Sequence, residues 1–207
     1  MDNRTLKRIL LSGLLFVGSS LGINAQHSEG ETTFQPRVGI SISNLTNDKD
    51  AKAKVNLTYG VEIEHYFTEN FSFAGGLLFL DQGAKYNDEG VKSTMNNYYT
   101  ALPLTVGYYP LPGLALRIGV QPALRVNTKI KQGDQSIDVD RFLALAYDGN
   151  DDVKLNKFDL SIPIGLSYEF KNVVLDARYN FGCTKVISGS GDKSRNSVFT
   201  ITLGYKI

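Results

Sequence analysis

The stretch that decides the fold reads Leu57-Thr58-Tyr59-Gly60-Val61-Glu62-Ile63-Glu64-His65-Tyr66-Phe67. Its odd-numbered residues are apolar or aromatic apart from His65, and its even-numbered residues are polar or small apart from Tyr66. Successive side chains of a β-strand point to opposite faces, so this alternation predicts a strand with one apolar and one polar face. Alone, it fits a soluble sheet as well as a membrane barrel, because a water-facing surface would also explain Glu62 and Glu64.

The same period of two residues recurs in seven further stretches. They are residues 35–43, 71–82, 97–109, 114–125, 158–170, 173–182 and 199–207. Pro103 has no N–H to donate to a neighbouring strand, so we expect a bulge in the stretch that contains it. The pattern therefore predicts an all-β protein of eight strands.

The connections between these stretches alternate in length. Three are short turns, at residues 68–70, 110–113 and 171–172, and four are longer polar loops, at residues 44–56, 83–96, 127–157 and 184–196. Short periplasmic turns and long extracellular loops are typical of barrels in the bacterial outer membrane. We therefore expect residues 35–207 to form an eight-stranded antiparallel up-and-down transmembrane β-barrel, with outer-membrane lipid around it and both chain ends at the periplasmic side.

The N-terminus resembles an export signal. Basic Arg4, Lys7 and Arg8 precede an apolar stretch, and small residues end it at Ala25. This order predicts a signal peptide over residues 1–25, followed by a flexible segment over residues 26–34. A membrane-anchoring helix is the alternative, but glycines and serines dilute the apolar stretch, which is also short for a span.

Composition argues against several functional classes. The chain has 22 Lys and Arg against 21 Asp and Glu, so nothing points to nucleic acid as a partner. Its single cysteine, Cys183, cannot form an internal disulfide, and we expect it to be a packed small residue rather than a reactive thiol. Only two histidines are present, and no catalytic pair, metal cluster or cofactor motif is evident. The sequence therefore predicts a protein that is not an enzyme.

The polar faces of the strands carry charges of both signs. If the apolar faces meet lipid, these charges line the barrel interior, and buried charges must be paired. We expect an interior charge network formed by Arg37, Glu62, Glu64, Arg117, Arg125, Asp159, Asp176 and Arg178. Because eight strands enclose a narrow space, this network would plug it. The alternative is a narrow porin-like channel for ions or small solutes through the same charges.

The longest loop contains an apolar run. Residues 142–147 read Phe142-Leu143-Ala144-Leu145-Ala146-Tyr147, between charged stretches. A solvent-facing loop seldom carries such a run without a use. We expect it to pack over the barrel mouth or to contact a protein partner, through Phe142, Leu143, Leu145 and Tyr147.

Three motifs resemble those of a known family. They are Asn97-Tyr98-Tyr99-Thr100-Ala101-Leu102-Pro103-Leu104, Phe158-Asp159-Leu160 followed by Gly165-Leu166-Ser167-Tyr168-Glu169-Phe170, and Ala177-Arg178-Tyr179-Asn180-Phe181-Gly182. They are similar to the strand motifs of PorT-like outer-membrane β-barrel proteins, and the resemblance covers nearly the whole mature chain. It implies location more firmly than task, because the activity of most members is undefined, although the name-giving member is tied to a protein secretion system.

The preferred hypothesis is a non-enzymatic outer-membrane barrel that acts through its surface loops or as part of an envelope assembly. A soluble lipocalin-like barrel that binds a ligand in its lumen is a further alternative, and it would place the apolar faces inward. The systematic difference in loop length argues against it.

Overall fold

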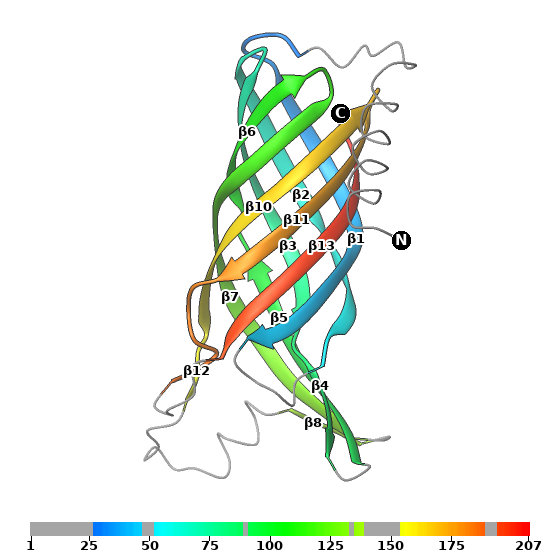
Figure 1. Cartoon of the computed structure of the whole chain (residues 1–207), viewed down its shortest axis with the longest axis vertical. Helices are drawn as coiled ribbons and strands as arrows, with labels where there is room; N and C mark the ends of the chain where they lie inside the picture. The colour runs from blue at the N-terminus through cyan, green and yellow to red at the C-terminus, as the bar shows by residue number, and fades with distance from the viewer. Residues whose placement is uncertain (1–26, 47–51, 89–90, 133–134, 139–153, 189–193) are drawn as a thin grey trace, which may run out of the picture.

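The protein forms a closed cylinder of β-strands (Figure 1). The computed structural model describes residues 27–46, 52–88, 91–132, 135–138, 154–188 and 194–207. The expected signal peptide, residues 1–25, lies outside these ranges. Among the described residues, no helix is long and apolar enough to cross a membrane.

Nine strands build the barrel wall. They are β1 (Thr32–Thr46), β2 (Lys54–Thr68), β3 (Phe71–Gln82), β5 (Val91–Ala101), β6 (Leu104–Leu111), β7 (Leu114–Gln132), β10 (Phe158–Phe170), β11 (Val173–Gly182) and β13 (Arg195–Tyr205). Strands β5 and β6 share one wall position between β3 and β7, and β7 pairs with β10 to close the ring, so the wall has eight positions. All these pairings are antiparallel. Each joins wall positions that follow one another along the chain, except that the last strand, β13, pairs with the first, β1. The eight-stranded up-and-down barrel predicted from the sequence is confirmed.

The two ends of the barrel differ. Short turns at residues 69–70, 112–113 and 171–172 lie at the upper end in Figure 1, together with the C-terminus, and we call this the short-turn end. The lower end carries the longer connections and is called the long-loop end. Here the expected loops contain further strands, namely β4 (Lys85–Asp88), β8 (Gln135–Asp138), β9 (Lys154–Leu155) and β12 (Ile187–Ser188).

The prediction that residues 83–96 and 127–157 form loops is therefore partly wrong. β4 pairs with the first half of β5, and β7 continues to Gln132 and pairs with β8. These extensions carry polar residues on both faces, so they lack the apolar alternation by which a strand is recognised in a sequence.

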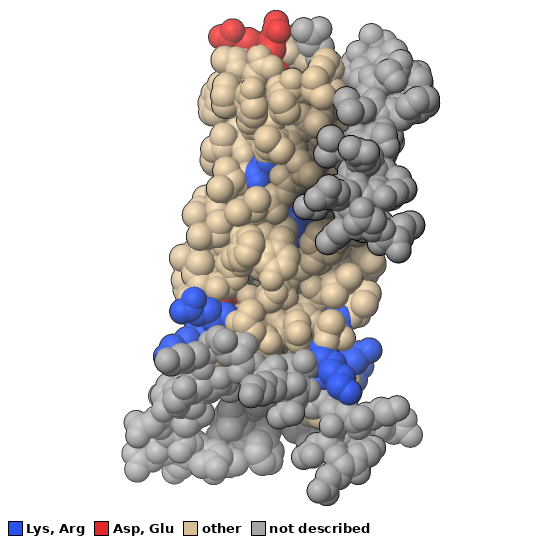
Figure 2. All heavy atoms as spheres, viewed as in Figure 1, with Lys and Arg blue, Asp and Glu red and all other residues tan. Residues whose placement is uncertain are grey.

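Burial follows the two-residue period. On β2 the even-numbered Glu62 and Glu64 are buried, whereas the odd-numbered Leu57 and Ile63 are 59% and 52% exposed. Figure 2 shows the result as a belt of mostly uncharged residues with small basic spots in it, acidic side chains at its upper edge and basic side chains gathered at its lower edge. Apolar side chains on this scale face lipid rather than water, so the soluble lipocalin-like alternative is wrong.

Pro103 produces no bulge. Ala101 pairs with Ala123 and Leu104 with Val120, so the register against β7 is the same on both sides of the proline. The backbone hydrogen bonds continue in register through this point, because the Pro103 carbonyl accepts from the Gly76 N–H at 3.1 Å and the Leu102 N–H donates to the Pro122 carbonyl at 2.8 Å. The register shifts instead at Tyr98 and Tyr99, where β5 meets β7.

Candidate functional site

The barrel interior collects the charges that the sequence assigns to it. The structure places all eight expected residues inside, none more than 8% exposed: Arg37, Glu62, Glu64, Arg117, Arg125, Asp159, Asp176 and Arg178. Glycines make room for the largest of them. Gly165 of β10 pairs with both Arg117 and Arg178, and a Cβ on Gly165 would lie 2.7 Å from the Cγ of Arg178. Small and large residues thus alternate around the narrow interior, as small barrels require.

Glu62 is the centre of the first group of ion pairs. Its two oxygens accept from the Nη1 and Nη2 atoms of Arg178, each at 2.9 Å. Arg37 Nη1 donates to Glu62 Oε2 at 3.1 Å, and Arg117 Nη1 lies 3.9 Å from Glu62 Oε1. Strands β2 and β11 are separated by β1 and β13, so the bidentate pair of Glu62 and Arg178 crosses the interior.

Asp176 lies among the same arginines. Its Oδ1 is 2.8 Å from Arg178 Nε, and its Oδ2 is 3.5 Å from Arg37 Nη2 and 3.9 Å from Arg117 Nε. Three guanidinium groups therefore share two carboxylates at this level of the barrel.

Glu64 continues the network toward the short-turn end. Its Oε1 accepts from Arg117 Nη2 at 2.7 Å, from the Ser72 hydroxyl at 2.6 Å and from the Tyr109 hydroxyl at 2.8 Å. Its Oε2 lies 3.2 Å from Lys206 Nζ. β2 and β7 are also not neighbours, so Arg117 and Glu64 form a second link across the interior.

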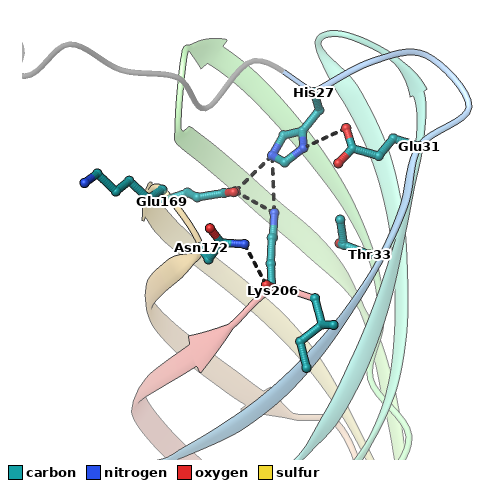
Figure 3. Close-up of a pocket in the computed structure, with 8 residues that line it drawn as sticks. His27, Glu31, Thr33, Glu169, Asn172 and Lys206 are labelled. Carbon is teal, nitrogen blue, oxygen red and sulfur yellow. Dashed lines mark hydrogen bonds and ion pairs between the residues drawn. The ribbon is translucent and has the colours of Figure 1, made fainter.

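At the short-turn mouth the network ends in a group of polar side chains (Figure 3). Lys206 Nζ donates to Glu169 Oε2 at 2.6 Å and also to the Tyr66 hydroxyl. The imidazole of His27 lies 3.0 Å from Glu169 and 3.2 Å from Glu31, and it stacks on Tyr66 with ring centroids 3.8 Å apart. The residues His27, Glu31, Glu169 and Lys206, together with Thr33 and Asn172, line a cavity of about 400 Å³.

We call these ion-paired side chains inside the barrel the interior network. It contains four cations and four anions: Arg37, Arg117, Arg178 and Lys206, and Glu62, Glu64, Asp176 and Glu169. Removing one partner from a buried pair leaves an uncompensated charge and typically costs about 3–5 kcal/mol. The balance of signs is therefore what allows so many charges to be buried together.

The remaining two expected residues lie in the long-loop half and stand apart from this network. Arg125 donates to the Asn156 carbonyl at 3.1 Å and to the Thr128 hydroxyl at 2.5 Å. Asp159 accepts from Asn196 Nδ2 at 2.9 Å and from the Thr184 hydroxyl. Neither residue contacts Glu62 or Glu64 in the described part of the chain.

An apolar cluster fills part of the same half. It consists of Leu78, Leu80, Tyr99, Ala101 and Ala123, all less than 8% exposed. Its side chains come from the inward faces of β3, β5 and β7.

Sequence reasoning missed His27 at the short-turn mouth. His27 was expected in a flexible segment, but it is buried, and β1 begins at Thr32 within that segment. A lone histidine outside any periodic stretch carries no sequence signal that it will be buried. Tyr66 and Tyr109 also face inward, and each is at most 4% exposed. The sequence signal for this orientation is the odd or even position of each residue along its strand.

Two other predictions have different outcomes. Cys183 is exposed rather than packed, because it lies just beyond the end of β11 at the long-loop end. The apolar run with Phe142, Leu143, Leu145 and Tyr147 lies outside the described residues. Within the described ranges, no group of three or more His, Cys, Asp or Glu side chains could hold a metal ion.

Comparisons with known proteins agree on the type of barrel. A family model described as "Outer membrane protein beta-barrel domain" matches residues 19–188. Among solved structures, Ail, the attachment invasion locus protein of Yersinia pestis, is 16% identical, with a TM-score of 0.51 over 86% of this chain and 99% of Ail. Neisserial surface protein A is 11% identical, with a TM-score of 0.52 over 86% of this chain and 99% of that protein. A search of curated proteins found no match.

Proposed function

Because this chain belongs to the family of outer membrane protein beta-barrel domains and lies in the bacterial outer membrane, we propose that it is a non-enzymatic barrel with a closed interior. It acts through the surface loops of its long-loop end or as part of an envelope assembly. The observation that carries this proposal is the interior network, whose ion pairs join strands that are not neighbours.

The width of the barrel supports a closed interior. Eight strands leave an interior just wide enough for side chains to fill. The guanidinium groups of Arg117 and Arg178 reach across that space and bond to carboxylates of β2 at 2.7 and 2.9 Å. Moving them aside would leave Glu62 with Arg37, and Glu64 with Lys206, as the remaining cation beside each buried carboxylate, so the closed arrangement is the stable one.

Conductance in a planar bilayer tests the closed interior. The refolded barrel, identified by its heat-dependent gel shift, is expected to give no discrete current steps. Discrete steps from the folded wild-type protein would reject the proposal.

A narrow ion path is the second candidate function. Polar contacts run without a break from Glu64 through Tyr109, Tyr66 and Lys206 to His27 at the mouth. Such a chain would carry ions if the pairs opened one after another. Current steps in the bilayer, removed by substitution of Lys206, would favour this candidate over the closed barrel.

The proposal that the protein is not an enzyme rests on its histidines. His27 contacts two carboxylates and Tyr66, and His65 Nδ1 contacts the Thr32 hydroxyl at 2.8 Å. Among the described residues, no carboxylate bonds to His65 to orient it as a general base for Thr32. Labelling of Thr32 by a fluorophosphonate probe in the folded protein would contradict this proposal.

We also propose that the long-loop end faces the cell exterior and that the chain is a PorT-like barrel. The difference in loop length and the three strand motifs support these assignments. Cys183 gives a direct test of orientation, because it is the single cysteine and is exposed at the long-loop end. A membrane-impermeant maleimide should label it on intact cells, whereas labelling only after permeabilisation would reverse the orientation.

The loop with Phe142, Leu143, Leu145 and Tyr147 is the proposed contact for a protein partner in such an assembly. Its apolar run, set between charged stretches, supports this role. Serine at these four positions should leave the heat-dependent gel shift unchanged while abolishing crosslinks from a photoreactive residue placed beside the run. Unchanged crosslinks would contradict the role.

A further inference from the structure

Three lysines lie side by side at the long-loop end. Lys52 and Lys85 are directly opposite each other and exchange both backbone hydrogen bonds, at 2.8 and 3.0 Å. Lys85 also pairs with Thr94 of β5, and Thr94 pairs with Lys131 of β7. All three lysines are exposed, and we call them the lysine row.

This arrangement concentrates positive charge. Directly opposed residues of a hydrogen-bonded antiparallel pair have Cα atoms about 5.5 Å apart, and each further strand adds about 4.8 Å. Like charges placed so closely destabilise the pairing of their strands. An anion bound between the ammonium groups would remove that penalty.

Nearby charges offset the lysine row only in part. Lys54 lies beside it on β2 and adds a fourth ammonium group. Asp81 Oδ1 accepts from Lys54 Nζ at 2.8 Å and is the one carboxylate, among the described residues, that forms an ion pair with any of these four lysines. Within the described ranges, the group therefore has four ammonium groups and one carboxylate paired with them.

The depth of the lysine row matches that of lipid headgroups. It lies at the long-loop end, where β4, β5 and β7 extend past the barrel (Figure 1). Basic side chains gather along the lower edge of the mostly uncharged belt in Figure 2, and most of the acidic surface in that view lies at the upper edge. A basic group just outside an apolar belt meets the phosphates of the adjacent leaflet.

We propose that Lys52, Lys85 and Lys131 form a binding site for the phosphate groups of the outer-leaflet glycolipid. This assignment rests on the proposed orientation, in which the long-loop end faces outward. Each ammonium group supplies three donors to phosphate oxygens, and the spacing of the row lets one phosphate contact two lysines. The site would hold one lipid molecule against the extended strands and neutralise the row.

The test is binding of diphosphoryl lipid A to the full refolded barrel in micelles of a zwitterionic detergent. The variant carrying Lys52→Gln, Lys85→Gln and Lys131→Gln should bind roughly 100-fold more weakly, because each lysine near an anionic surface contributes about a fivefold factor. Lys171→Gln is the matched control, since Lys171 is an exposed lysine in the short-turn end and should leave the affinity unchanged.

Lipid A without phosphates should bind the wild-type protein as weakly as diphosphoryl lipid A binds the triple variant. Equal affinity of the triple variant and the wild type would overturn the proposal, as would equal affinity for the two lipids. Displacement of lipid A by inorganic phosphate at an equal phosphate concentration would assign the row to small anions instead. If the triple variant does not give the heat-dependent gel shift, Lys85→Gln alone should show about a fivefold loss.

This measurement is independent of orientation in the cell. Binding in micelles reports on the lysine row, whereas maleimide labelling of Cys183 reports on which end faces outward. Failure of one proposal can therefore be told apart from failure of the other.

Discussion

The two halves of the barrel interior are filled by different chemistry. In the short-turn half, four cations and four anions form links between strands that are not neighbours. In the long-loop half, an apolar cluster around Leu80 and Tyr99 fills space, and Asp159 bonds to the neutral side chains of Asn196 and Thr184. The same eight-stranded wall thus supports an ionic closure at one end and neutral packing at the other.

This difference shows what strand geometry decides and what it leaves open. Alternation decides which side chains point inward, and it does so equally in both halves. The choice between charge and packing depends on whether a partner of opposite sign lies at the same level on another strand. Arg117 has Glu64 within 2.7 Å, whereas Asp159 accepts from the uncharged side chains of Asn196 and Thr184.

Glu62→Ala should have the largest effect on stability. It removes the carboxylate shared by Arg37 and Arg178 and leaves both guanidinium groups with one fewer partner in a buried site. We expect the free energy of unfolding to fall by about 3–5 kcal/mol. Urea titration in micelles, followed by circular dichroism because the chain has no tryptophan, measures the change. An unchanged midpoint would show that the ionic closure contributes little.

Leu80→Ala tests the packing of the long-loop half. Leu80 is 3% exposed within the apolar cluster, so its truncation removes contacts and leaves a cavity. We expect a loss of about 2–4 kcal/mol in the same titration. High salt should leave this loss unaltered, because no charge is involved. Leu57→Ala is the control, since Leu57 faces lipid and its truncation opens no interior cavity. Equal losses for the two variants would mean that the cluster does not pack as described.

His27→Ala should have a smaller effect, confined to the short-turn mouth. It removes the stacking on Tyr66 and one contact of Glu169, while Lys206 still neutralises that carboxylate. We expect a loss of about 1–2 kcal/mol. Amide hydrogen exchange should increase at residues 27–34 and stay unchanged in the long-loop half. An increase spread over the whole barrel would show that the mouth is not a separate unit.

Much of the fold follows from the sequence because the membrane imposes it. Lipid on one side and a polar interior on the other force the alternation seen in residues 57–67, and short turns mark one end. The extensions β4 and β8 lie beyond the lipid, so their polar faces carry no such signal. The buried position of His27 depends on a tertiary contact with Tyr66, which no local sequence pattern predicts.

The candidate site was predictable in part, for a related reason. Position along the strand places Glu62 and Arg178 on the inward face, but it does not say which pairs meet across the barrel. That depends on the register of strands that are not neighbours and on glycines such as Gly165, which leaves room for the aliphatic part of the Arg178 side chain. For the same reason, the sequence predicted one network that contains Arg125 together with Glu62 and Glu64.

The most direct test of the ionic closure is a double-mutant cycle on Glu64 and Arg117, whose side chains meet at 2.7 Å across the interior. Glu64→Gln, Arg117→Met and the double variant are unfolded in urea, and the same cycle is run on Gln121 and Ser161, a neutral pair of the long-loop half at 3.5 Å. We predict a coupling energy of about 2–3 kcal/mol for Glu64 and Arg117 and less than about 1 kcal/mol for the neutral pair. Equal coupling in the two cycles would contradict the claim that charges close the short-turn half.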